Sequence, residues 1–281
     1  MGLHLDAMGR KIGPLSKEYA WKDVVLYALG VGAGFEELEY VYEKRLKPLP
    51  SFAAAAVFDF FWEAGAASGV NLAGVLHGEQ DLVLHRPMPI EGSLATEGAI
   101  EEIYDLGAQK GAIVAAEAIT SDSEGCELFT NRMTIFGKLD GGFGGKPPPR
   151  RDKLVPQRPP DDEMKDRPAS NQPLIYRLSG DFFQLHADPE LARQVGFAGP
   201  IMHGLCTYGF ACRACIKALL PGEPERVRRF SCRFTRPLYP GRPIATQIWH
   251  MGDGKAAWRV VNEDTGEVVI DNGLLEYVES E

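Results

Sequence analysis

The chain has 281 residues, enough for one large domain or two of ordinary size, and 44% of them are apolar, as in globular proteins. The formal net charge of -9 argues against nucleic acid as the main partner, because an acidic surface repels the phosphate backbone. The number of cysteines is 5, which is odd, and their spacing is irregular, so we expect no disulfide framework and a reducing compartment.

The N-terminal residues lack the charged and apolar regions of a signal peptide. No stretch reaches the roughly 18 apolar residues of a membrane span, because the most apolar one, residues 51–70, contains Asp59 and Glu63. The C-terminal residues 278–281 do not match a peroxisomal address. We therefore expect a cytoplasmic protein that has no membrane partner.

Residues 141–166 are rich in glycine and proline, with Gly141-Gly142-Phe143-Gly144-Gly145 followed by consecutive prolines at 147–149. Consecutive prolines disfavour helices and central strands alike. We expect no regular structure from there to about Leu174. The predicted division is an N-terminal domain at 1–145, a proline-rich linker at 146–166, and a C-terminal domain at 167–281.

The two flanks of this linker share a hidden repeat. Arg86-Pro87 is followed by Ala95-Thr96, and Arg236-Pro237 is followed by Ala245-Thr246 at the same distance. Further on, a glycine precedes an asparagine at matching places in both halves. The shared order of these motifs predicts two copies of one fold.

The two copies also differ in length. Each has a His-Gly pair upstream, His77-Gly78 and His203-Gly204, but the second copy has about 24 more residues before its Arg-Pro pair. These predict a buried helix, because apolar residues recur at three- and four-residue spacing from 205 to 219 and Pro221-Gly222 follows. We interpret Cys212 and Cys215, a CxxC pair, as packing residues of this helix. The first copy is expected to have lost most of it, which leaves volume for a substrate tail.

The rest of the second copy has the pattern of strands. Phe230, Cys232 and Phe234 alternate with polar residues, and residues 258–261 and 267–270 flank a hairpin turn. A long helix with an antiparallel meander is an α+β unit, and a sheet wrapped around one helix is the hotdog architecture. The predicted fold is a double hotdog of two fused units, with the helix shortened in the first.

The densest polar segment is residues 176–189. Asp181 and His186 lie five residues apart, and a carboxylate that shares a water with a histidine can activate that water near neutral pH. The alternative interpretation is that Asp181 caps a turn and His186 is an ordinary surface residue. Asp188, followed by Pro189 and later by Gly196, has the pattern of a helix N-cap, so we assign it to capping.

The start of the long helix, at Gly204, offers free backbone N–H groups and a partial positive charge. The N–H of Gly204 can therefore receive an oxygen that gains negative charge, and a plain helix start is the alternative. The histidines are scattered, without HExxH or His-x3-His spacing, so we predict no metal site.

Several motifs occur in the same order as in one known family: residues 76–80 and 141–145 in the first half, and 176–189, 200–207 and 234–241 in the second. On these residues the chain resembles the MaoC-like, type 2 (R-specific) enoyl-CoA hydratases, especially the double-hotdog hydratase unit of peroxisomal multifunctional enzymes and its bacterial relatives. The resemblance implies a hydro-lyase that reversibly adds water, in syn fashion, to trans-2-enoyl-CoA and forms (3R)-3-hydroxyacyl-CoA.

The resemblance also implies roles for particular residues. The catalytic pair falls on Asp181 and His186, and the N–H that binds the oxyanion falls on Gly204. No cofactor is expected, since coenzyme A is part of the acyl-CoA substrate. The predicted substrate-binding residues are His77, Gly78, Leu106, Ser179, Gly180, Phe183, Gln184 and Phe234.

The chain departs from the family pattern Asp-x-Asn-Pro-x-His, because Phe183 and Gln184 stand at the Asn and Pro positions. Leu106 stands where the family has a lysine that contacts the substrate. Two alternatives stay open, a hotdog acyl-CoA thioesterase and an acyl-CoA-binding subunit with an impaired site. The acyl group is undefined, a homodimer is compatible with the pattern, and the candidate cations for the phosphates lie at 226–233 and 146–153.

Overall fold

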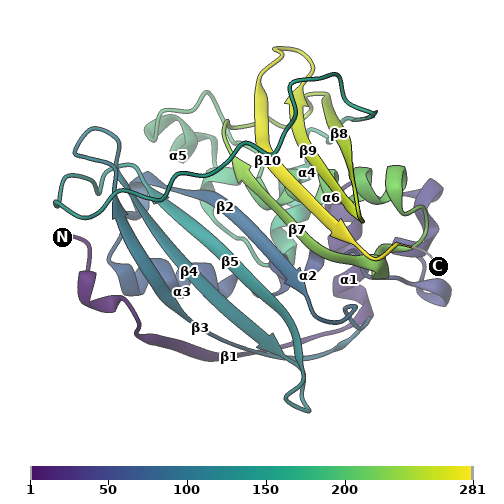
Figure 1. Cartoon of the computed structure of the whole chain (residues 1–281), viewed down its shortest axis with the longest axis horizontal. Coiled ribbons are helices and arrows are strands. Elements are labelled where there is room, and N and C mark those ends of the chain that lie inside the picture. The colour runs from purple at the N-terminus through teal and green to yellow at the C-terminus, as the bar shows by residue number, and fades with distance from the viewer. Residues whose placement is uncertain (1, 280–281) are drawn as a thin grey trace.

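The computed structural model describes residues 2–279, which contain one antiparallel ten-stranded sheet (Figure 1). The strand order across the sheet is β1-β3-β4-β5-β2-β7-β10-β9-β8-β6. The strands are β1 (Lys11–Tyr19), β2 (Val75–Leu84), β3 (Gly92–Asp105), β4 (Ala112–Ser121), β5 (Glu127–Gly137), β6 (Asp162–Asp166), β7 (Val227–Phe234), β8 (Ile244–Gly252), β9 (Lys255–Asn262) and β10 (Val268–Tyr277).

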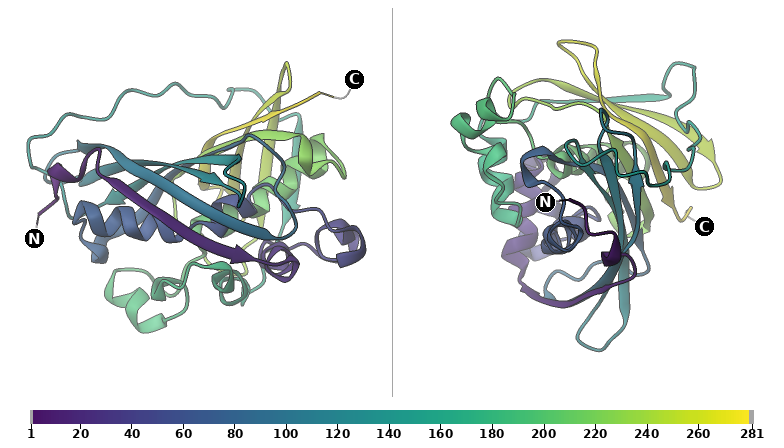
Figure 2. Two further views of the ribbon diagram at one scale, coloured as in Figure 1. Left: turned by 90° about the horizontal axis from the view of Figure 1, so that it is seen from below. Right: turned by 90° about the vertical axis from the view of Figure 1, so that its left-hand side faces the viewer.

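Helices α3 and α6 pack against one face of this sheet, and the linker after β5 crosses the opposite face (Figures 1 and 2). The α-helices are α1 (Trp21–Gly30), α2 (Phe52–Ala56), α3 (Asp59–Ser68), α4 (Gln172–Tyr176), α5 (Pro189–Gln194) and α6 (Gly204–Leu219). The 3-10 helices are η1 (Leu5–Ala7), η2 (Phe35–Tyr40), η3 (Glu43–Arg45), η4 (Leu72–Gly74), η5 (Arg177–Ser179), η6 (Gln184–His186) and η7 (Pro224–Arg226). In the part of the chain that the structure describes, no helix is long and apolar enough to cross a membrane.

The order of the strands confirms the hidden repeat. Reading outward from the centre, β2, β5, β4, β3 and β1 of the first half correspond to β7, β10, β9, β8 and β6 of the second. The repeated Thr96 and Thr246 are both buried at equivalent places in β3 and β8. The two halves meet where β2 pairs with β7, so the double hotdog forms one continuous sheet.

The repeat does not include the two His-Gly pairs, and that part of the prediction is wrong. His77 lies inside strand β2, whereas His203 is the N-cap of α6. The counterpart of α6 is α3, which ends at nearly the same distance before its own Arg-Pro pair. Helix α3 has 10 residues and α6 has 16, so the first helix is shortened, as expected, but most of it is retained upstream of His77.

Local predictions in the second half are confirmed. Helix α6 covers the predicted residues and is buried on nearly all sides, with Cys212 and Cys215 inside the core. The side chain of Asp188 accepts hydrogen bonds from the first turn of α5, as a capping residue does. Strands β9 and β10 pair across the predicted hairpin turn.

The end of the predicted linker is not irregular. Residues Asp162–Asp166 form the edge strand β6, which pairs only with β8 among the described strands. Four of its five residues are charged, so the segment lacks the apolar alternation by which strands are recognised. Short, charged edge strands are common, because they discourage pairing with other chains.

A buried ion pair ties α6 to the first half of the chain. The Arg213 guanidinium donates to the Glu37 carboxylate at 2.7 and 2.9 Å and to the Val31 carbonyl at 2.6 Å. Only 10% of the Arg213 side chain and 11% of the Glu37 side chain are exposed. A further bond reaches Asp166 of β6 at 3.2 Å, so this guanidinium connects three separate segments.

We predict that Glu37→Gln lowers the free energy of unfolding by about 3 kcal/mol, because it leaves a buried guanidinium without its main counter-charge. Urea unfolding at pH 7 measures this change. Asp264→Asn, which breaks the exposed pair with Arg242, is the control and is expected to cost less than about 1 kcal/mol. Equal losses of stability in the two variants would show that the buried Arg213–Glu37 pair contributes no more than an exposed ion pair.

Candidate active site

A cavity of about 560 Å³ lies where β2 and β7 join the two halves. Its walls come from these two strands, from α3, from the segment after α4 and from the start of α6. Most of the wall is apolar, and few polar groups point into it, which is typical of small-molecule sites. Eight of the predicted site residues line it: His77, Gly78, Leu106, Asp181, Phe183, His186, Gly204 and Phe234.

The other three predicted residues are not among those that line the cavity. Ser179 and Gly180 lie in the turn that leads into Asp181, where Gly180 has a φ of 133° that strongly favours glycine. The Ser179 hydroxyl is buried and has no hydrogen-bond partner among the described residues. Gln184 is exposed at the start of η6.

The carboxylate of Asp181 is held by the backbone and largely removed from water. Its Oδ1 accepts a hydrogen bond of 3.1 Å from the N–H of Phe183, which leaves Oδ2 available to a ligand. Burial raises the pKa of the Asp181 carboxyl to about 6, although the Phe183 N–H and the charge of Arg177 act in the opposite direction. A carboxylate of this kind is a stronger base than an ordinary one.

The hydrogen bonds of His186 define its tautomer. Its Nδ1 lies 2.9 Å from the carbonyl oxygen of Ile201, which can only accept, so Nδ1 carries the proton. The lone pair of the neutral ring is therefore on Nε2. Burial lowers the pKa of His186 to about 4, so this ring is neutral at physiological pH.

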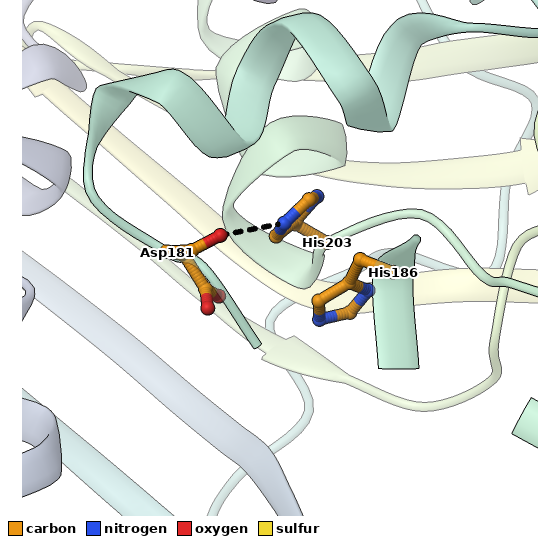
Figure 3. A group of neighbouring side chains, drawn as sticks. All are labelled: Asp181, His186 and His203. Atoms are coloured by element: carbon orange, nitrogen blue, oxygen red, sulfur yellow. Dashed lines mark hydrogen bonds between the residues drawn. The ribbon is translucent and has the colours of Figure 1, made fainter. Parts of the chain in front are cut away.

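His203 completes a cluster with Asp181 and His186 (Figure 3). Its Nε2 donates a 3.1 Å hydrogen bond to the backbone carbonyl of Asp181, and its ring stacks on that of His186 with 3.8 Å between centroids. His203 is 1% exposed, and burial together with the neighbouring His186 lowers its pKa well below the usual value. It is thus a neutral ring that holds both members of the pair in place. The sequence placed it at the helix start but suggested no such role.

The same three residues offer one ligand atom each within 4.8 Å of one another, so a metal ion has to be considered. The lone pairs of an imidazole lie in the plane of its ring. Because the His186 and His203 rings are stacked at 27°, their nitrogens point side by side and do not converge on one ion. One nitrogen of each ring is also engaged with a backbone carbonyl. This arrangement suits proton transfer better than metal binding, and a metal-free site stays our prediction.

The N-terminus of α6 faces the same cavity. The first intrahelical bonds run from Cys206 and Thr207 to the carbonyl of His203, so the N–H of Gly204 precedes them. The ring of Phe234 lies so close that a Cβ at Gly204 would be 3.1 Å from it. Glycine thus allows both the close contact with Phe234 and the approach of a ligand to the helix end.

Gly78 has a structural reason to be glycine. A Cβ there would lie 2.6 Å from the Oγ1 of Thr134 on β5, and the register between the two strands shifts between His77 and Glu79. His77, directly before this irregularity, lines the cavity, and burial lowers the pKa of its ring to about 4. Its Nε2 contacts the carbonyl of Glu79 at 3.1 Å.

Two of the four arginines in the predicted basic segment at 226–233 are paired with acids of β2. Arg229 forms a bidentate pair with Asp81, and Arg233 pairs with Glu79 at 2.7 Å. Arg151, from the second predicted segment, contacts the same Glu79 at 2.8 Å. Arg233 and Arg236 line the cavity, so its charged rim lies on the β2–β7 side.

Arg177 is the cation whose charge acts on all three members of the cluster. Its guanidinium donates a 3.1 Å hydrogen bond to the carbonyl of Phe182 and stacks on that ring, which closes the loop around Asp181. Its Nε is buried without a partner among the described residues. The sequence pattern gives no sign of this role for Arg177 beyond its place four residues before Asp181.

Two family models together match most of the chain: an "MFE-2 hydratase 2 N-terminal domain" at residues 18–138 and a "MaoC like domain" at 152–273. The chain is 37% identical to 3-hydroxyacyl-thioester dehydratase Y of Mycobacterium tuberculosis, over 99% of both proteins. It is 35% identical to the mouse peroxisomal multifunctional enzyme type 2 over 97% of its own length, but spans only 38% of that enzyme. The crystal structure of a MaoC-like dehydratase from Phytophthora capsici superposes with a TM-score of 0.88 at 29% identity, covering 99% of this chain and 98% of the other.

We predict that Arg177→Gln raises the pKa of Asp181 above its value in the unchanged protein, because a charge that stabilises the carboxylate is lost. A ¹³C NMR titration of the Asp181 carboxyl, identified by its loss in Asp181→Asn, measures this pKa. Arg177→Lys keeps the charge and is expected to leave the pKa nearly unchanged, as is Arg193→Gln on exposed α5. An unaltered pKa in Arg177→Gln would limit Arg177 to holding the loop.

Proposed function

The chain belongs to the family of MaoC-like type 2 hydratases, and we propose that its cavity adds water to trans-2-enoyl-CoA thioesters, with Asp181 and His186 as the catalytic pair. The observation that carries the proposal is the position of this pair beside the N-terminus of α6. Three groups face one apolar cavity: the Asp181 carboxylate as a base, His186 as a hydrogen-bond acceptor for the water, and the N–H of Gly204 as a hydrogen-bond donor to the oxyanion. These are the groups that hydration of an activated double bond requires.

The two catalytic side chains have different tasks. Asp181, whose pKa is about 6, is a stronger base than neutral His186, whose pKa is about 4. We therefore assign proton removal to the free Oδ2 of Asp181. The lone pair on Nε2 of His186 accepts the other hydrogen of the same water and aims its oxygen at C3.

The reaction then balances within this set of groups. The water oxygen bonds to C3 while Asp181 takes one of its protons, and the double-bond electrons move toward the thioester oxygen. The N–H of Gly204, at the positive end of α6, stabilises that enolate. Asp181 returns the proton to C2 from the face on which the oxygen was added, so the addition is syn. The (3R) configuration is the one implied by the family resemblance.

The thioesterase alternative needs a test that distinguishes it from hydration. Free thiol release from an enoyl-CoA would reveal the thioesterase alternative, while loss of enoyl absorbance without thiol release reports hydration. The steps above use no metal or redox cofactor. A homodimer and a cytoplasmic location remain proposals. The five free cysteines support a reducing compartment.

We predict that Asp181→Asn and His186→Ala each lower the rate of hydration by about 10²-fold or more, because each removes a group that acts on the reacting water. The rate is measured with an enoyl-CoA by loss of absorbance. Asp188→Asn makes the same chemical change a few residues away, at a helix cap where Asn serves well, and is expected to keep its activity. Near-normal rates in either catalytic variant would refute the assignment.

We also predict one acyl-CoA site per chain. The first half has no counterpart of Asp181 and His186, and both halves contribute to the walls of one cavity. Calorimetric titration of Asp181→Asn with a 3-hydroxyacyl-CoA, which this variant is expected to bind without turnover, gives the number of sites. A stoichiometry of two equal sites per chain would contradict the prediction.

A further inference from the structure

A continuous row of rings runs around the cavity from the catalytic pair. The row, here called the aromatic wall, consists of Phe183, Trp62, Phe61, His77 and Phe234, and all five residues line the cavity. It starts at His186, whose ring centroid is 6.2 Å from that of Phe183. The successive distances along the wall are 5.3, 5.5, 4.9 and 4.9 Å, each between neighbouring ring centroids.

The rings of the wall present both faces and edges to the cavity. None of the successive pairs is stacked in parallel, because the interplanar angles range from 42° to 87°. His77 belongs to this surface as a neutral ring, since burial lowers its pKa to about 4. The wall therefore carries no charge along its length.

Part of the wall comes from elements other than those of the charged rim, because Phe61, Trp62 and Phe183 lie outside β2 and β7. Glu79, Arg233 and Arg236 come from β2, from β7 and from the residues that follow it. The rings of Phe61 and Trp62 come from α3, and Phe183 comes from the segment next to the catalytic pair. A CoA thioester carries its phosphates at one end and its acyl group at the other, so the acyl group is the part that meets the aromatic wall.

We propose that the acyl group taken by this site carries a flat unsaturated ring close to C3, and that Phe183 and Trp62 select it. The inference rests on the proposed hydratase function. Phe183 adjoins His186, which acts at C3, so a substituent near C3 lies against Phe183 and Trp62. Both side chains are only partly buried, so they face the cavity as well as the protein.

The physical reason for this preference is the shape and charge distribution of aromatic rings. A flat ring that meets tilted rings gains edge-to-face contacts beyond the burial of its area. A flexible alkyl chain of the same size gains only area and loses rotational freedom when it is ordered. Phe183 cannot donate or accept a conventional hydrogen bond, so it contributes to this site through shape and ring contact alone.

Three substrates with the same number of acyl carbons test the inference: 5-phenylpent-2-enoyl-CoA, 5-cyclohexylpent-2-enoyl-CoA and undec-2-enoyl-CoA. The first two differ in flatness and aromatic character but hardly in bulk. We expect kcat/KM for the phenyl substrate to exceed that for the cyclohexyl substrate by about three- to tenfold. The straight-chain substrate reports whether the chain hydrates enoyl-CoA at all.

Variants then locate the preference. Phe183→Leu and Trp62→Leu are expected to bring the phenyl-to-cyclohexyl ratio close to one, whereas Phe183→Tyr keeps a ring and the ratio. Phe182→Leu, next in the chain but exposed and outside the cavity lining, is the matched control and is expected to keep the ratio too. A ratio compares two substrates in one protein, so a partial loss of folded enzyme does not alter it.

The three substrates distinguish failure of the aromatic preference from failure of the hydratase proposal. Hydration of undec-2-enoyl-CoA together with equal rates on the two cyclic substrates would overturn the aromatic preference and leave the hydratase intact. A preference that survives in both leucine variants would overturn the role of Phe183 and Trp62. No turnover of any of the three substrates would overturn the hydratase proposal and this inference with it.

Discussion

The antiparallel pairing of β2 with β7 is the contact on which the arrangement of the site depends. It joins two five-stranded halves edge to edge, so neither half exposes its inner strand and both present helices on the same face. Cross-strand ion pairs, Asp81 with Arg229 and Glu79 with Arg233, fit this register and no register shifted by one residue. The same seam places His77 of one half beside Phe234 of the other, which closes the cavity between them.

The two halves are equivalent in topology and unequal in chemistry. The longer helix, α6, brings its N-terminus and Gly204 to the cavity and places His203 behind them against His186, while the shorter α3 contributes aromatic side chains. A duplicated fold offers two equivalent places for a site. In this chain a single cavity lies between the halves, and each half contributes different side chains to its walls. Under the proposed function, the reacting groups come from the second half, and three of the five rings of the aromatic wall come from the first, which favours a single site per chain.

The features that the sequence predicted correctly depend on neighbours in the chain. The span of α6, the cap at Asp188 and the hairpin between β9 and β10 follow from spacing and from turn residues. The family resemblance supplied the double hotdog, which composition alone would not have distinguished from other α+β folds. The prediction that His77-Gly78 corresponds to His203-Gly204 was wrong, because a two-residue motif does not reveal whether it lies in a strand or at a helix start. Strand β6 was missed because it is almost wholly charged and lacks apolar alternation. The stacking of His203 and the buried pair of Arg213 depend on contacts between distant segments, which no local pattern contains.

Burial of the proposed catalytic pair makes the stability of the protein depend on pH in two opposite ways, both below neutral pH. Burial raises the pKa of Asp181 to about 6, so its folded form favours the proton, and the stability that this contributes at low pH is lost as the pH rises through that value. Burial lowers the pKa of His186 to about 4, so its folded form disfavours the proton, and stability is lost as the pH falls below the usual histidine range. Near pH 7 the carboxylate is therefore charged at an energetic cost, and that cost is what makes it a strong base. The rest of the fold has to offset this cost, while the hydrogen bonds of Arg213 to Glu37 and Val31 tie the helix that bears Gly204 to the first half of the chain.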